Sequence, residues 1–95
     1  MNSGGYRYYM ILCYSVAKEA KYKKNEHGHY IKCVFGIQVD GEEPKTEKER
    51  IAKAYEMRKW VSEQINVNMF FMVPITKERY DAEDYDSEKG SNIHG

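Results

Sequence analysis

Apolar residues alternate with mixed ones along the first part of the chain. In YRYYMILCYSV, residues 6–16, every even position is apolar or aromatic. The segment HYIKCVFGIQV, residues 29–39, alternates in the same way at its odd positions from Ile31 onward. This period of two predicts two β-strands, each with one face toward a core, and we expect them to pair antiparallel. Gly36 indicates a bulge or a close approach in the second strand.

The segment between these strands, AKEAKYKK at residues 17–24, has two interpretations. Residue propensities favour a helix, with Ser15 as a possible N-cap and Asn25 as a possible C-cap. Alternatively, the first strand continues into a long hairpin that turns near Lys24–Gly28. We favour the hairpin, because eight residues with little apolar stripe make a marginal helix.

A turn and a helix follow. DGEEP, residues 40–44, is typical of a turn. TEKE is typical of a capping box, in which the Thr46 hydroxyl accepts a hydrogen bond from the Glu49 amide. The helix is expected to continue to about Ile65. Its apolar stripe consists of Ile51, Ala54, Val61 and Ile65, whereas Trp60 lies away from that stripe.

The next segment, MFFMVPI at residues 69–75, is apolar on both faces and predicts a third strand that is buried on both sides. Pro74 lacks a backbone donor, so this end of the strand should leave the sheet or lie at its edge. The remaining residues are acidic, with almost no aliphatic side chains. The prediction is therefore an α+β domain at residues 1–77, an antiparallel sheet in ββαβ order packed on one amphipathic helix. Residues 78–95 are predicted to be a flexible acidic tail.

One helix can cover only one face of this sheet. The second face would expose Tyr9, Ile11 and Cys13, together with one side of residues 69–75. An exposed apolar patch of this kind is typical of an interface, which predicts a homodimer or a protein partner on the second face. The alternative is that the tail folds back and covers the patch with Tyr80 and Tyr85.

Composition and charge argue against two classes of protein, those that coat DNA and those that span a membrane. The 95 residues suffice for one domain, and the net charge is zero. Residues 1–41 carry a net charge of +3 and residues 78–95 carry −4, which is not the basic excess of a protein that coats DNA. We find no membrane span and no signal peptide, so we expect a cytoplasmic protein without membrane contact. Cys13 and Cys33 would point to opposite faces of the sheet, which disfavours a disulfide.

The strongest candidate for binding is a basic region at residues 18–32. It consists of Lys18, Lys21, Lys23, Lys24 and Lys32, with Tyr22 and Tyr30 between them. Lysines neutralise phosphates, and tyrosine rings can stack on bases, so the pattern favours binding of nucleic acid or a nucleotide. The absence of arginine removes bidentate recognition. The alternative is a lysine-rich turn that is simply solvated.

Catalysis and metal binding have weaker support. His27 and His29 are the candidate catalytic residues of a small histidine-dependent nuclease, which is our third hypothesis. No nucleophile motif, carboxylate pair or glycine-rich phosphate loop accompanies them. His29 and Cys33 are too far apart along an extended strand to share one ion, so we expect neither a metal site nor a cofactor.

A second functional hypothesis is a small accessory or inhibitor protein that binds and regulates a larger protein. In its small size and its lack of a catalytic motif, the chain resembles proteins that phages and other mobile elements encode. The candidate partner-binding residues are Tyr9, Ile11, Trp60, Tyr80 and Tyr85. YYMILCYSV also resembles the first strand of small ferredoxin-like CRISPR-associated nucleases, but Ser15 stands where that family would carry an aspartate. The resemblance therefore implies no site residue, and non-enzymatic binding is the function we expect.

Overall fold

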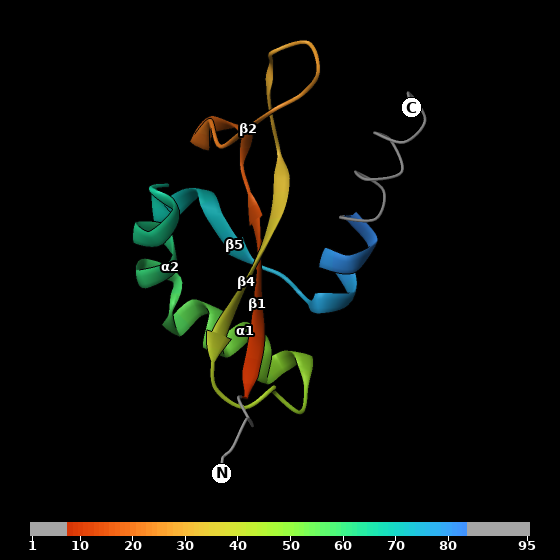
Figure 1. Cartoon of the computed structure of the whole chain (residues 1–95), viewed down its shortest axis with the longest axis vertical. Helices are drawn as coiled ribbons and strands as arrows, with labels where there is room; N and C mark the ends of the chain where they lie inside the picture. Colours follow the sequence, from red (N-terminus) through yellow and green to blue (C-terminus); the bar gives the residue numbers. More distant parts are fainter. Residues whose placement is uncertain (1–7, 84–95) are drawn as a thin grey trace.

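The first two predicted strands form the centre of the molecule in the computed structural model, which describes residues 8–83. β1 (Tyr9–Val16) lies between β4 (Cys33–Asp40) and β5 (Met72–Pro74) and runs antiparallel to both. Figure 1 shows this sheet nearly edge-on, with helices on either side. The α+β class predicted from the sequence is confirmed.

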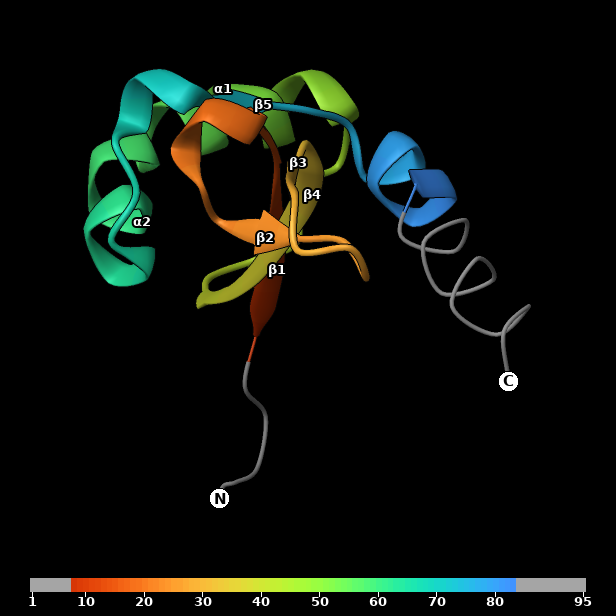
Figure 2. The same cartoon turned by 90° about the horizontal axis from the view of Figure 1, so that it is seen from above.

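The alternation of β1 is also confirmed. Its even residues form the core face, and Leu12, Tyr14 and Val16 are completely buried. The register sets these side chains opposite the odd residues of β4, for example Leu12 opposite Ile37. This core face packs against α1 (Glu47–Glu56) and α2 (Arg58–Ile65). Seen from above, α2 lies on one side of the sheet and the helical residues 77–83 on the other (Figure 2).

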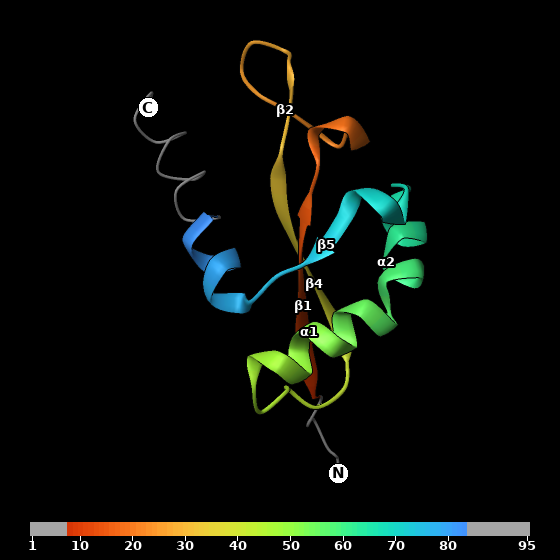
Figure 3. The ribbon, with the colours of Figure 1, turned by 180° about the vertical axis from the view of Figure 1, so that it is seen from behind.

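The single helix predicted from Thr46 to Ile65 is wrong at Met57, where the chain leaves helical geometry and divides α1 from α2. The predicted cap is present, since the Thr46 hydroxyl accepts from the Glu49 amide at 3.1 Å. The segment contains neither glycine nor proline, the residues with the lowest helix propensity. Tyr14 in the core donates its hydroxyl to the Ala54 carbonyl at 2.6 Å, in the last turn of α1, where carbonyls lack helical partners. Figure 3 shows how the break turns α2 toward β5.

The predicted third strand is wrong over its first half. Residues Met69–Phe71 form a short 3₁₀ turn, η2, and only Met72–Pro74 form β5. The Asn68 side chain accepts from the Phe70 amide at 2.9 Å and so starts this turn. Phe70 and Val73 consequently face outward, with 75% and 51% of their surface exposed, rather than being buried on both faces. β5 is an edge strand, as Pro74 indicated.

Between β1 and β4 the favoured hairpin is present, with one short helical turn inserted. η1 (Lys18–Ala20) follows β1 directly. β2 (Lys23–Lys24) then pairs antiparallel with β3 (Tyr30–Ile31). Figure 1 shows this hairpin extending beyond the end of the sheet.

The second face of the sheet is covered at its centre by the chain itself. Residues 77–83 are helical, and Tyr80 lies against Gly36 of β4 so closely that a Cβ there would be 2.7 Å from its Cζ. The close approach indicated by Gly36 is thus confirmed. Cys13 on this face is completely buried. Tyr80 therefore covers the centre of the patch, as in the alternative considered above, whereas Tyr9 and Val73 remain 43% and 51% exposed. Tyr85 and most of the predicted tail lie outside the described residues.

A buried arginine closes the edge of β1 beyond the end of β5. Arg50 is 4% exposed, and its Nη1 donates to the Ile11 carbonyl at 2.6 Å. The same guanidinium pairs with Glu43 and with both carboxylate oxygens of Glu47. Glu47 also accepts from the Lys77 amide at 2.7 Å, and this bond lowers the pKa of the Glu47 carboxyl. The network thereby joins β1, α1 and the helical residues 77–83.

Candidate functional site

Residues 18–32, which we call the basic hairpin, have a well-defined tip. The side-chain oxygen of Asn25 accepts from the amides of His27 and His29 at 2.9 and 3.0 Å. Gly28 adopts a positive φ of 82°, which glycine tolerates without strain. η1 lies beside β3 and widens the base of the hairpin. The turn is therefore held by its own sequence.

All five predicted lysines of the basic hairpin are exposed. They are Lys18, Lys21, Lys23, Lys24 and Lys32. Together with two glutamates, Glu19 and Glu26, they give the segment a net charge of +3. Lys24 Nζ lies 5.0 Å from the centre of the Tyr30 ring, within the range of a cation–π contact. The structure therefore gathers this charge beyond one end of the sheet.

Of the two tyrosines predicted to stack on bases, Tyr22 also has a packing role. Its ring meets Phe35 edge-on, with centroids 5.8 Å apart. Burial raises the pKa of its hydroxyl. Tyr22 thus attaches the basic hairpin to the core face of the sheet, although Tyr22 and Tyr30 are similarly exposed, at 39% and 41%.

Next to the hairpin lies an apolar groove that the sequence did not predict. Two lysines of the basic hairpin and Glu19 border an apolar floor. The lining residues are Ser15, Ala17, Lys18, Glu19, Lys32, Phe70, Phe71 and Val73. Phe70 is the most exposed of the large apolar side chains within residues 8–83. The only sequence signal for the exposed position of Phe70 was Asn68, a typical N-cap residue that precedes the two phenylalanines.

The candidate catalytic histidines, His27 and His29, lie on the exposed tip of the hairpin. Glu26 Oε1 is 3.8 Å from His27 Nε2, and both of these side chains are solvated. Within residues 8–83 no group of three or more side chains is arranged to hold a metal ion. Both histidines are therefore solvent-exposed side chains of the hairpin turn.

The two cysteines lie on opposite faces of the sheet, as predicted. Cys13 is opposite Gly36 on the second face, and Cys33 is opposite Val16 on the core face. Burial raises the pKa of the Cys13 thiol to about 11 and also raises that of Cys33. A nucleophilic cysteine needs a thiolate, so neither residue is suited to that role at neutral pH.

The predicted partner-binding residues do not form one surface. Tyr9, Ile11 and Tyr80 belong to the second face, where Tyr9 is 43% exposed and the other two are half-buried. Trp60 lies on α2, which packs on the opposite side of the sheet (Figure 2), and is 44% exposed. Tyr85 lies outside the described residues.

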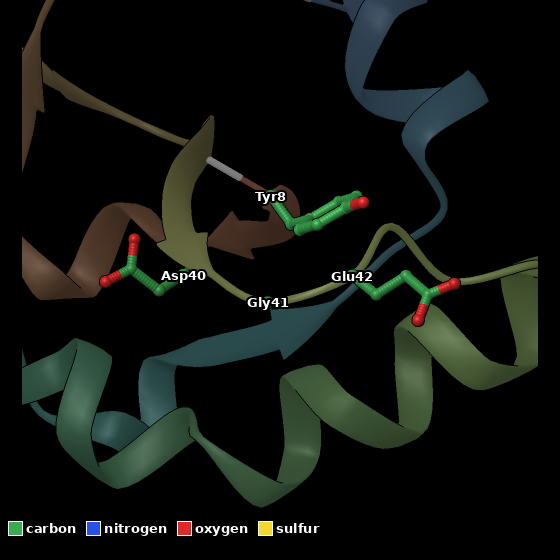
Figure 4. Close-up of a pocket in the computed structure, with 4 residues that line it drawn as sticks. All are labelled: Tyr8, Asp40, Gly41 and Glu42. Atoms are coloured by element: carbon green, nitrogen blue, oxygen red, sulfur yellow. The ribbon is translucent and has the colours of Figure 1, made fainter. Parts of the chain in front are cut away.

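A shallow pocket occurs at the end of the sheet opposite the basic hairpin. It is lined by Tyr8, Asp40, Gly41 and Glu42. Figure 4 shows that the Asp40 and Glu42 carboxylates point away from each other. They therefore do not converge on a common ligand position.

Comparison with known proteins gives no further assignment. No protein-family model, no curated protein and no solved structure matches this chain. Within residues 8–83, no helix is long and apolar enough to cross a membrane.

Proposed function

We propose that the protein binds single-stranded nucleic acid through the basic hairpin and the adjoining groove. The observation that supports this most directly is the position of Phe70, which is largely exposed in a groove bordered by Lys18 and Lys32. An exposed aromatic ring beside positive charge is the arrangement by which proteins stack a base and neutralise its phosphate.

The chemistry of the surface favours a single strand over a duplex. Bases of a duplex are already stacked, whereas the bases of a single strand can reach an exposed ring. The lysines act as point charges and carry no planar fork for reading base edges. We therefore expect binding that depends strongly on salt and weakly on sequence.

Charge reversal in the hairpin tests the electrostatic part of this proposal. The triple variant Lys21→Glu, Lys23→Glu and Lys24→Glu should weaken binding of a labelled single-stranded oligonucleotide at least tenfold, because each lost phosphate contact removes a counterion-release contribution. The change would be measured by a mobility shift across a salt series.

The matched control is Lys45→Glu, Lys48→Glu and Lys59→Glu, which makes the same change in charge at exposed positions outside the hairpin. Equal weakening by both triple variants would contradict a localised site. No shift of any oligonucleotide at low salt would reject the proposal. It would leave the second hypothesis, a protein partner, for which Tyr55 and Trp60 are exposed on α1 and α2. A pull-down with and without nuclease would then identify that partner.

The aromatic part of the site is tested separately. Phe70→Ala should weaken single-strand binding about tenfold, since one stacked base contributes roughly 1–3 kcal/mol. Phe70 is 75% exposed, so the variant should keep the stability of the wild type. Tyr55→Ala, at an exposed aromatic on α1, is the control and should bind normally. If the salt slope is unchanged while affinity falls, the loss lies in stacking and not in phosphate contacts.

A further inference from the structure

β4 presents a free hydrogen-bonding edge. The Gly41 amide donates to the Tyr8 carbonyl. Opposed residues in an antiparallel pair alternate between hydrogen-bonded and non-hydrogen-bonded pairs, so the odd residues of β4 direct their N–H and C=O groups to β1. The even residues Val34, Gly36 and Gln38 must then direct their N–H and C=O groups away from the sheet. Within residues 8–83, these outward groups form no backbone hydrogen bond, and β4 is the last strand on its side.

This edge lacks the features that protect the opposite one. β5 is only three residues long and contains Pro74. Where β5 ends, the Arg50 side chain takes its place beside β1 and bonds the Ile11 carbonyl. β4 is eight residues long, contains no proline or lysine, and keeps an unbroken register with β1. Unprotected edges of this kind pair with another strand. The core-face side chains Cys33, Phe35 and Ile37 are also only half-buried, whereas their partners on β1 are fully buried.

We propose that two copies of the chain pair antiparallel through β4, about a twofold axis at Gly36. This register opposes Gly36 to Gly36 of the second copy and so engages every outward N–H and C=O group from Val34 to Gln38. On the core face it sets Phe35 opposite Ile37 of the second copy. Aromatic–aliphatic pairs of this type stabilise neighbouring strands.

Charge complementarity identifies a second copy as the occupant. β4 runs from the basic hairpin, with net charge +3, to residues 40–49, where five acidic side chains and two lysines leave −3. Antiparallel pairing places each charged end beside the opposite charge of the other copy. In the same register Lys32 lies opposite Asp40 of the second copy, and both side chains are exposed on the second face.

The helical residues 77–83 do not occupy this edge. They approach the second face from the side of α1, where the Lys77 amide bonds Glu47. Pairing through β4 engages Lys32, which also borders the apolar groove, but leaves the other four lysines of the basic hairpin exposed. Gln38 does not line the groove, so a variant at Gln38 tests dimerisation separately from nucleic-acid binding.

The test is light scattering coupled to size exclusion on the nuclease-treated full chain over a dilution series. The mass should approach twice the 11.2 kDa of one chain at high concentration. Lys32→Asp and Asp40→Lys should each raise the dimer dissociation constant about tenfold, because each introduces two like-charge pairs into the dimer. The double variant should restore the wild-type constant.

A backbone variant tests the edge itself. Gln38→Pro removes an outward donor without removing a bond to β1 and should be monomeric at every concentration, with an unchanged circular dichroism spectrum. Gln38→Ala keeps the amide and should dimerise. A wild-type protein that stays monomeric throughout would overturn the proposal. So would a Gln38→Pro dimer of wild-type affinity, or failure of the double charge swap to recover association. None of these outcomes depends on whether an oligonucleotide binds.

Discussion

Replacing Arg50 by alanine should lower the free energy of unfolding by about 1.5–3 kcal/mol, the usual contribution of a hydrogen bond made by a charged group. The guanidinium is almost completely buried and bonds the Ile11 carbonyl while pairing with Glu43 and Glu47. Its loss leaves the Ile11 carbonyl without its donor and removes the positive charge that pairs with both carboxylates. Since small domains have total stabilities of about 5–15 kcal/mol, a large fraction of the protein should unfold on mild heating.

Urea unfolding followed by circular dichroism would measure this change. Arg79→Ala is the matched control, because the Arg79 side chain forms an exposed pair with Glu83, one helical turn away at 2.6 Å. Such pairs contribute about 0.3–0.5 kcal/mol. Arg50→Lys keeps the charge but loses the planar guanidinium with its several donors, so its free energy of unfolding should lie between those of Arg50→Ala and Arg79→Ala. Equal stability of Arg50→Ala and Arg79→Ala would show that the Arg50 network is not important for folding.

Adding a methyl group at Gly36 should cost about 2–3 kcal/mol, as overpacking of a filled site typically does. The Cβ of Gly36→Ala would lie 2.7 Å from Tyr80 Cζ and 2.9 Å from its hydroxyl oxygen. An aromatic ring cannot bend away, so residues 77–83 would have to leave the second face. The expected result is a less stable protein in which Cys13 becomes accessible to thiol reagents.

The variant Tyr80→Ala separates this clash from any effect of alanine on the strand. Combined with Tyr80→Ala, Gly36→Ala should cost nothing or even stabilise β4, where glycine is unfavourable by roughly 0.5–1 kcal/mol. A double-mutant cycle on urea midpoints would give the coupling between the two residues. Additive changes would mean that Tyr80 does not pack on Gly36 in solution.

Local patterns determined the parts of this fold that depend on local chemistry. The period-2 alternation identified the core face of β1 and β4, because side chains in a strand must alternate between faces. Thr46 marked the start of α1, because its hydroxyl satisfies an amide that every helix start leaves free. A hairpin was the favoured interpretation of residues 17–24, where η1 adds a short helical turn, and the clustering of the lysines was predicted. Gly36 indicated a close approach without revealing which residue makes it.

Features that depend on residues far apart in the sequence became apparent only in the tertiary structure. The break at Met57 and the outward turn of Phe70 have no strong local signal, and the groove that includes Phe70 exists only once β5 lies beside β1. Tyr22 became a packing residue because Phe35 is its neighbour in space. Arg50 is buried because β5 ends before Ile11, which leaves a carbonyl for a side chain to satisfy. Residues near one another in sequence thus determined the elements, whereas the free edge of β4 and the covered centre of the second face follow from which elements meet.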